Sequence, residues 1–126
     1  MLEEVEFEDL GEVLLVKPKG ELGVHGALEF RTKVQERLQA GKRRVVLDCS
    51  ELVFIDSAGF GELLVCRQHL KKIGGEIHLA RLGRSASSVL KTFNVGTLFQ
   101  SHETVEAALE AMKRGSQATG ASEGSA

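Results

Sequence analysis

The sequence is poor in the residues that mark several specialised protein classes. Its 126 residues include no tryptophan, no tyrosine, one proline and two cysteines. Only six phenylalanines are present, most of them at core-like spacing, so the chain lacks the exposed aromatic platform on which single-stranded nucleic acids stack. The net charge is −2 and the basic residues are spread along the chain. A nucleic-acid partner is therefore not expected.

Long apolar runs are missing as well. No stretch of about 18 apolar residues occurs, as a membrane-spanning helix would need. Residues 1–13 are acidic and lack both the basic start and the apolar stretch of a secretory signal. We therefore expect a cytoplasmic protein without membrane insertion.

The two cysteines do not form a metal or redox motif. Cys49 falls in an apolar, strand-like run and Cys66 in a helical run, with no Cys-x-x-Cys pattern and no histidine at metal-ligand spacing. Both are predicted to be buried free thiols. No metal site and no cofactor are expected.

The apolar pattern switches between strand and helix periods along the chain. Strands are predicted over residues 5–7, 12–19, 43–47, 76–80 and 97–99, with residues 53–55 extending or following the third. Four helices are predicted from apolar positions spaced three and four apart: Ala27, Phe30, Val34 and Leu38; Phe60, Leu63, Cys66, Leu70 and Ile73; Val89, Leu90 and Phe93; Val105, Ala108, Leu109 and Met112.

Local signals predict where the last helices begin and end. Ser85 and Ser101 are predicted N-caps of the third and fourth helices, because a serine oxygen can accept from the free N–H groups there. Gly115 is predicted to end the fourth helix. Residues 115–126 contain no large apolar side chain and are expected to form a disordered tail.

Strands alternating with amphipathic helices favour the α/β class. We predict a single domain over residues 1–114, with a mostly parallel mixed β-sheet of four to five strands and about four α-helices. Binding sites in such sheets lie near the carboxyl ends of the strands. The loop after Ile55 is therefore a candidate site.

Two polar residues, Asp56 and Ser57, stand at this junction of strand and helix. One interpretation is an N-cap, because either side chain can accept from unpaired backbone N–H groups. A second interpretation starts from the small residues that follow, Ala58, Gly59 and Gly61, since each glycine costs a helix about 0.5–1 kcal/mol relative to alanine. Small residues allow the backbone of another segment to approach closely. A helix N-terminus also tolerates a phosphate on a nearby hydroxyl, because its dipole and free N–H groups favour an anion.

Three segments in order along the chain carry a family resemblance. They are KPKGELG (residues 17–23), LDCSELVFIDSAGFGELL (47–64) and KKIGGEIHLARL (71–82). The chain resembles the STAS domains in these segments, and within them the bacterial anti-sigma factor antagonists. The resemblance covers roughly residues 5–112 and implies a STAS-like fold.

The resemblance implies a switch. The serine directly after the aspartate, here Ser57, would be phosphorylated by a partner anti-sigma factor that is an ATP-using serine kinase, and a PP2C-type phosphatase would remove the group. The unphosphorylated protein would hold the kinase, so that a sigma factor is released. Asp56 would orient the hydroxyl. The implied docking face consists of Glu21, Leu22, Gly23, Asp56, Ala58, Gly59, Phe60 and Gly61.

The sequence departs from the family pattern at one position. Family antagonists commonly carry an aspartate after Gly-Glu-Leu, whereas this chain has Gly23. One acidic contact is therefore missing from the implied docking face. STAS domains also serve as scaffolds in stress signalling, as cytoplasmic parts of anion transporters and as accessory subunits of lipid transport complexes. The alternative function is such a scaffold or accessory subunit, with a structural Ser57.

No catalytic residue is expected. A hydrolase would need a Gly-x-Ser-x-Gly elbow around Ser57, but Ile55 stands where the first glycine should be. The glycine pair 74–75 lacks the following Lys-Ser or Lys-Thr of a phosphate-binding loop and is interpreted as a turn. Arg81 and Arg84 follow a predicted strand and either face a phosphate near Ser57 or are solvated surface residues.

Overall fold

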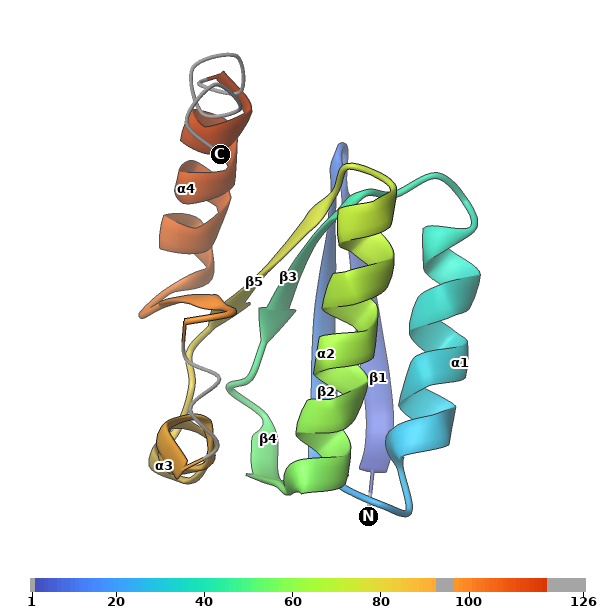
Figure 1. The fold of residues 1–126 in the computed structure, drawn as a ribbon, viewed down its shortest axis with the longest axis vertical. Helices are drawn as coiled ribbons and strands as arrows, with labels where there is room; N and C mark the ends of the chain where they lie inside the picture. Colours follow the sequence, from blue (N-terminus) through green and yellow to red (C-terminus); the bar gives the residue numbers. More distant parts are fainter. Residues whose placement is uncertain (1, 93–96, 118–126) are drawn as a thin grey trace.

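The computed structural model describes residues 2–92 and 97–117, which form a mixed sheet with helices on both faces (Figure 1). The elements are, in order, β1 (Leu2–Leu10), β2 (Val13–Leu22), α1 (Ala27–Leu38), β3 (Arg44–Asp48), β4 (Leu52–Ile55), α2 (Ser57–Lys72), β5 (Glu76–Ala80), α3 (Arg84–Thr92), β6 (Gln100–His102) and α4 (Val105–Gln117).

The sheet is mostly parallel. Its main path runs β1-β2-β3-β5-β6, and β4 pairs with β2 beyond the end of β3. Only the β1–β2 hairpin is antiparallel among the strand pairs that the structure describes. The chain therefore leaves β2, β4 and β5 at one end of the molecule, the lower end in Figure 1.

Strand β1 forms one edge of the sheet and is acidic. It is paired on one side by β2. Five of its nine residues are carboxylates, and all five are exposed: Glu3, Glu4, Glu6, Glu8 and Asp9. Two of them have cationic neighbours, since Glu6 lies 3.0 Å from the Lys19 amine and Asp9 pairs with Lys42.

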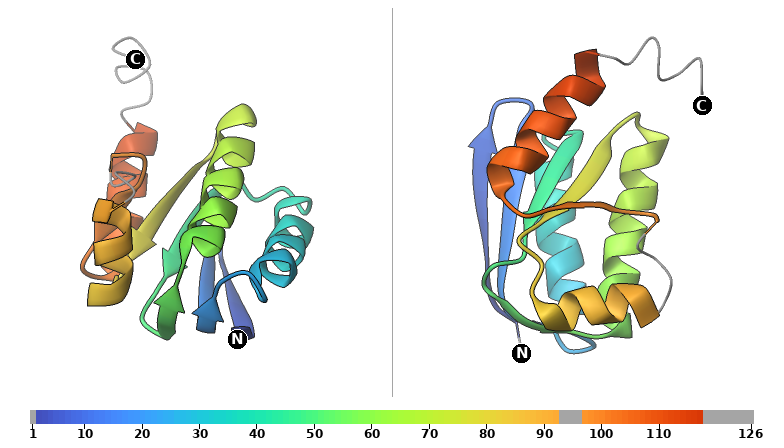
Figure 2. Two further views of the ribbon diagram at one scale, coloured as in Figure 1. Left: turned by 60° about the horizontal axis from the view of Figure 1, so that its bottom comes forward. Right: turned by 90° about the vertical axis from the view of Figure 1, so that its left-hand side faces the viewer.

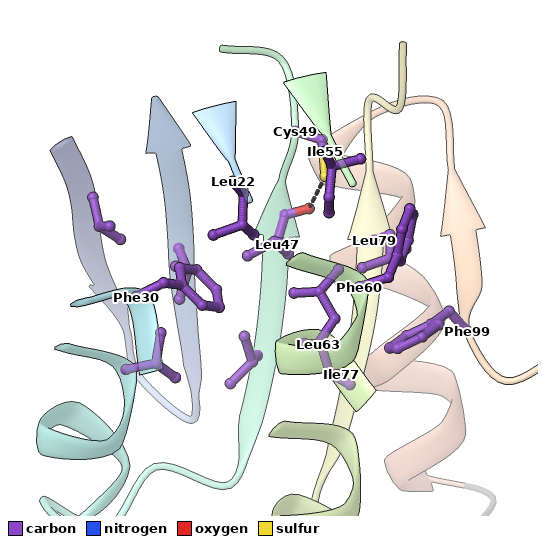
Figure 3. Packing of buried hydrophobic residues seen from close by; sticks show 14 of the residues in the cluster. Leu22, Phe30, Leu47, Cys49, Ile55, Phe60, Leu63, Ile77, Leu79 and Phe99 are labelled. Carbon is purple, nitrogen blue, oxygen red and sulfur yellow. Dashed lines mark hydrogen bonds between the residues drawn. The ribbon is translucent and has the colours of Figure 1, made fainter. Parts of the chain in front are cut away.

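The core lies on both faces of β3. Val45 and Leu47 pack with residues of α1 and α2, whereas Val46 packs with Ala108 and Met112 of α4. Figure 2 shows α4 on the opposite face of the sheet from α1 and α2. Figure 3 shows the larger cluster, in which the side chains of Leu22, Leu47, Ile55, Phe60 and Leu63 fill the space between the sheet and α2.

The predicted helix faces are largely confirmed. All four predicted positions of α1 are buried, as are Phe60, Leu63 and Leu70 of α2. Ile73 is an exception, because it follows α2 as its C-cap and is 39% exposed. The apolar stripe of α2 therefore ends one turn earlier than predicted.

The strand count differs from the prediction. Six strands are present instead of four to five, since the chain turns between Asp48 and Leu52 and makes two strands there. The strand predicted over residues 97–99 was misplaced. Phe99 is buried, but the strand begins after it, and β6 pairs with β5 over only three residues. So short a strand is set by its neighbour and not by its own side-chain pattern.

The fourth helix also differs at both ends. The prediction of Ser101 as its N-cap was wrong, because Ser101 lies in β6. Thr104 caps the helix instead, since its Oγ1 accepts from the N–H of Ala107 at 3.0 Å. The helix runs to Gln117, past Gly115. The remainder of the predicted tail, residues 118–126, and Phe93 lie outside the described residues. Helix α3 begins at Arg84, so Ser85 is a helical residue instead of its cap.

Both cysteines are free thiols, as predicted. Cys49 is buried and Cys66 is half-buried. Burial, reinforced by the charge of Asp48 beside Cys49 and of Glu62 beside Cys66, raises the pKa of each to about 12. The two thiols are therefore protonated and unreactive at neutral pH.

Two histidines join the last strand to the rest of the sheet. His78 is buried on β5, with Nε2 at 2.9 Å from Glu76 Oε1 and Nδ1 at 3.0 Å from Nε2 of His102. The two rings stack with their centroids 5.1 Å apart. Burial lowers the pKa of His102, and the charges of His78 and Arg114 add to this effect. The hydrogen bond to His78 lowers the pKa of Glu76.

We expect the stability of the fold to fall below about pH 6.5. Unfolded His102 gains its proton near its ordinary pKa of 6.5, whereas the folded residue does so only at lower pH. The unfolded state then binds more protons, so the free energy of unfolding decreases as the pH falls through this window.

Urea unfolding of wild type and His102→Gln between about pH 7 and pH 5 tests this pH dependence. The window lies above the range in which Glu76 titrates. His102→Gln should show a shallower pH dependence. The exposed His25 offers a control, and His25→Gln should keep the wild-type slope. Equal slopes in all three proteins would contradict the assignment to His102.

Candidate functional site

The two polar residues at the junction of β4 and α2 have different roles in the structure. Asp56 is the N-cap of α2, with extended backbone, and its Oδ1 accepts from the N–H of Gly59 at 3.0 Å. The cap interpretation is therefore confirmed for Asp56. Ser57 is the first helical residue and is exposed, and in the described part of the chain its hydroxyl makes no hydrogen bond. The fold does not need that hydroxyl for capping.

The loop after β2 lies directly against this junction. The N–H of Asp56 donates to the carbonyl of Leu22 at 3.3 Å, and β2 and β4 are in register there. Gly59 also faces that carbonyl, since a Cβ at position 59 would lie 2.1 Å from the Leu22 oxygen. The structure thus brings together the two segments, residues 21–23 and 56–61, that the resemblance placed on one face.

Gly23 makes room for the capping carboxylate. A Cβ at position 23 would lie 2.7 Å from Asp56 Oδ2 and 3.1 Å from its Cγ. A side chain at position 23 therefore requires the carboxylate of Asp56 to shift. Glycine at this position fits the arrangement of Asp56 that the structure shows.

The candidate residues differ in accessibility. Glu21 and Ser57 are exposed, and Gly23, Asp56, Ala58 and Gly61 are half-buried. The side chains of Leu22 and Phe60 are buried, as is Gly59, so these three support the face from beneath. Gly61 is different from Gly59, because a Cβ there would meet nothing within 4 Å. Gly61 leaves open surface beside Ser57.

Exposed apolar side chains near this junction were missed by the sequence analysis. Val53, Val24 and Leu28 are 71%, 69% and 68% exposed, which makes them the three most exposed of the large hydrophobic residues that the structure describes. Phe54 is 44% exposed. The run Val53-Phe54-Ile55 looks like a core strand, but only Ile55 is buried. Leu28 could have been recognised, because it lies off the apolar stripe of α1.

The charges around the junction are mixed. The first turn of α2 contains no acidic residue, and the carboxylate of the N-cap Asp56 faces the partial positive charge of the helix N-terminus. Arg81 Nη1 lies 3.9 Å from the carboxylate of Asp48, which is buried, and Lys17 Nζ lies 3.8 Å from the same group. The charge of Arg81 is therefore directed toward Asp48. Arg84 lies at the start of α3, beside β4.

The described residues offer neither a metal site nor a membrane-spanning helix. Within residues 2–92 and 97–117, no three side chains of histidine, cysteine, aspartate or glutamate lie close enough together to hold a metal ion. None of the helices that the structure describes combines the length and apolar character needed to span a bilayer.

Comparison with known proteins identifies the family. The family model of the STAS domain matches residues 4–108. The chain belongs to the STAS domain family. The resemblance found in three short segments of the sequence is therefore confirmed over most of the chain.

Relatives of similar length carry related names. A Bordetella bronchiseptica protein named "Putative anti-sigma factor antagonist BtrV" is 26% identical over 107 residues, which cover 85% of this chain and 92% of that protein. An anti-sigma factor antagonist from Mycobacterium paratuberculosis has the same fold, with a TM-score of 0.80 at 20% identity over 87% of this chain and 93% of its own.

The Bacillus protein SpoIIAA has the same fold in two states. Its unphosphorylated form gives a TM-score of 0.77 at 20% identity over 87% of this chain and 96% of SpoIIAA. Its phosphorylated form gives a TM-score of 0.69 at 22% identity, over 86% of this chain and 99% of the SpoIIAA chain. At these identities the structural likeness establishes the fold, a single α/β STAS domain.

The different surroundings of the two glycines of α2 predict opposite effects of alanine. Gly59→Ala should destabilise the protein by about 1–3 kcal/mol or more, because the new methyl group would overlap the Leu22 carbonyl. Gly61→Ala should stabilise it by about 0.5–1 kcal/mol, because the site is open and alanine favours the helix. Urea unfolding of both variants measures this. Equal effects would show that the Leu22 contact is unimportant.

A double-mutant cycle tests the contact between Gly23 and Asp56. Asp56→Ala should cost about 0.5–2 kcal/mol through loss of the cap. Gly23→Ala should cost a similar amount in wild type, because it displaces the carboxylate, and little in the Asp56→Ala background. Gly23 has no positive φ, so backbone strain does not contribute. Additive free energies of unfolding would refute the coupling.

Proposed function

We propose that this STAS domain is an anti-sigma factor antagonist that is switched by phosphorylation of Ser57. The unphosphorylated domain holds an anti-sigma factor serine kinase, so that a sigma factor is released, and phosphorylation ends the complex. The observation that carries the proposal is the division of tasks at the helix start, where Asp56 caps α2 and leaves the Ser57 hydroxyl exposed.

Accessibility supports Ser57 as a phosphate acceptor. A kinase must reach the hydroxyl with an ATP-bound active site, and Ser57 is exposed at the end of the molecule where β2, β4 and β5 end. Asp56 precedes it and Gly61 leaves open surface one turn later. Asp56 positions the helix start, and through it the hydroxyl, by its bond to Gly59.

Charge explains how one phosphate can act on binding without unfolding the domain. It adds about −1.5 to −2 charges, which the N-terminus of α2 accommodates in place. The same charge next to Asp56 disfavours an apolar or acidic partner surface, and like charges in an interface cost several kcal/mol. Since each 1.4 kcal/mol changes affinity about tenfold, one phosphate is enough to dissociate a micromolar complex.

The exposed apolar residues supply the attraction. Val24 and Leu28 lie on one side of the junction, on the loop after β2 and the first turn of α1, and Val53 and Phe54 lie on β4. Such residues scattered singly over a surface need no explanation, but a group of them around one exposed hydroxyl is typical of a protein interface. The docking face therefore includes these residues together with Glu21, Gly23, Asp56, Ala58 and Gly61.

The relatives agree with this function. BtrV carries the antagonist function in its name, and SpoIIAA has been solved with and without its phosphate. In the proposed cycle this domain catalyses no reaction. The kinase supplies the phosphoryl group from ATP, and a PP2C-type phosphatase returns the domain to its binding form. The cycle takes place in the cytoplasm, where sigma factors act.

Phosphorylation and binding can be measured with a candidate anti-sigma factor serine kinase and ATP. Wild type should incorporate phosphate from ATP, whereas Ser57→Ala should incorporate none. Ser57→Asp should lose binding to the kinase by calorimetry, because its carboxylate mimics part of the phosphate charge. The exposed Ser101 of β6 provides the control, and Ser101→Ala should be phosphorylated as wild type is. Unchanged binding by Ser57→Asp would favour a scaffold or accessory role.

A further inference from the structure

An open groove lies between β4 and the start of α3. Its volume is about 200 Å³, and its lining consists of Leu52, Val53, Phe54, Ile55, Gly83, Arg84 and Ala86. The groove shares Val53 and Phe54 with the docking face and extends it toward α3, and β4 leads directly into Asp56 and Ser57. Figure 1 shows α3 end-on near β4 at the lower end of the molecule, and the two elements are in contact.

Strand β4 offers backbone as well as side chains to this groove. It pairs with β2 along one edge, and no other strand that the structure describes pairs with its second edge. That edge lies toward α3. Free strand edges bind extended peptides, because backbone N–H and C=O groups form the contact and side-chain pockets select the sequence.

The side chains of the groove combine apolar surface with one positive charge. Val53 and Phe54 are both exposed large hydrophobic residues. Arg84 is exposed, and in the described part of the chain no carboxylate pairs with it. Arg81, by contrast, lies 3.9 Å from Asp48. The charge of Arg84 is therefore available to a partner.

We propose that this groove receives an extended segment of the partner kinase, in which an apolar side chain packs on Val53 and Phe54 and an adjacent aspartate or glutamate pairs with Arg84. A guanidinium group favours a carboxylate because it can donate two parallel hydrogen bonds. The inference rests on the proposed function, and adds a second contact whose chemistry differs from that of the Ser57 surface.

The two contacts have separate roles. The groove strengthens the complex, whereas the charge on residue 57 decides whether the complex forms. Variants in the groove should therefore weaken binding of the kinase to the unphosphorylated domain. They should leave intact the loss of binding caused by Ser57→Asp, because that substitution acts through residue 57.

The test measures kinase affinity by calorimetry for Phe54→Ala and Arg84→Glu. Each should weaken binding by about tenfold, and higher salt should weaken wild type more than Arg84→Glu. A glutamate in the first turn of α3 is favourable for the helix, so Arg84→Glu should remain folded. Thermal unfolding checks both variants.

Matched substitutions elsewhere serve as controls. The side chain of Val65 on α2 is 42% exposed, a fraction similar to the 44% of Phe54. Lys72 is the last residue of α2, at the opposite end of the molecule. Val65→Ala and Lys72→Glu should bind the kinase as wild type does. If wild type binds and Ser57→Asp does not, but Phe54→Ala and Arg84→Glu bind normally, the groove inference fails while the proposed function stands. If wild type binds no kinase, both fail.

Discussion

The contact between Gly59 and the carbonyl oxygen of Leu22 joins the two chain segments that make the site. Because glycine has no Cβ, the first turn of α2 can approach the end of β2, and the N–H of Asp56 reaches the same carbonyl. Residues far apart in the sequence thus become one surface. Its geometry is set by backbone atoms within the folded core, so the surface exists before any partner arrives and needs little ordering on binding.

Asp56 is the second element of this arrangement. Its carboxylate bonds to the N–H of Gly59 and leans over Gly23, so the cap, the loop and the helix start depend on one side chain. A helix start needs only one such acceptor at this position. Once aspartate fills that need, the neighbouring serine is available for other chemistry. In the proposed switch, the order Asp-Ser therefore separates stability from regulation.

Periodicity predicted most of the architecture and only part of the site. Strand β3 and helices α1 and α2 could be predicted because burial on both faces or along one stripe leaves a regular apolar pattern. Strand β6 could not be located, because pairing with β5 fixes three residues whose own pattern is uninformative. At the site, either Asp56 or Ser57 could have been the cap from residue types alone. The space over Gly23 and the exposure of Val53 depend on tertiary packing, which no local pattern contains.

The acidic edge strand β1 has a consequence for how copies of this domain meet one another. A nine-residue strand with an open side is a template on which a second copy could add its own strand. The five exposed carboxylates of β1 would face five more in such a pair, and their mutual repulsion opposes this edge-to-edge pairing at neutral pH. In acid, once these groups are protonated, that repulsion is lost and the edge is no longer protected against pairing with a second copy.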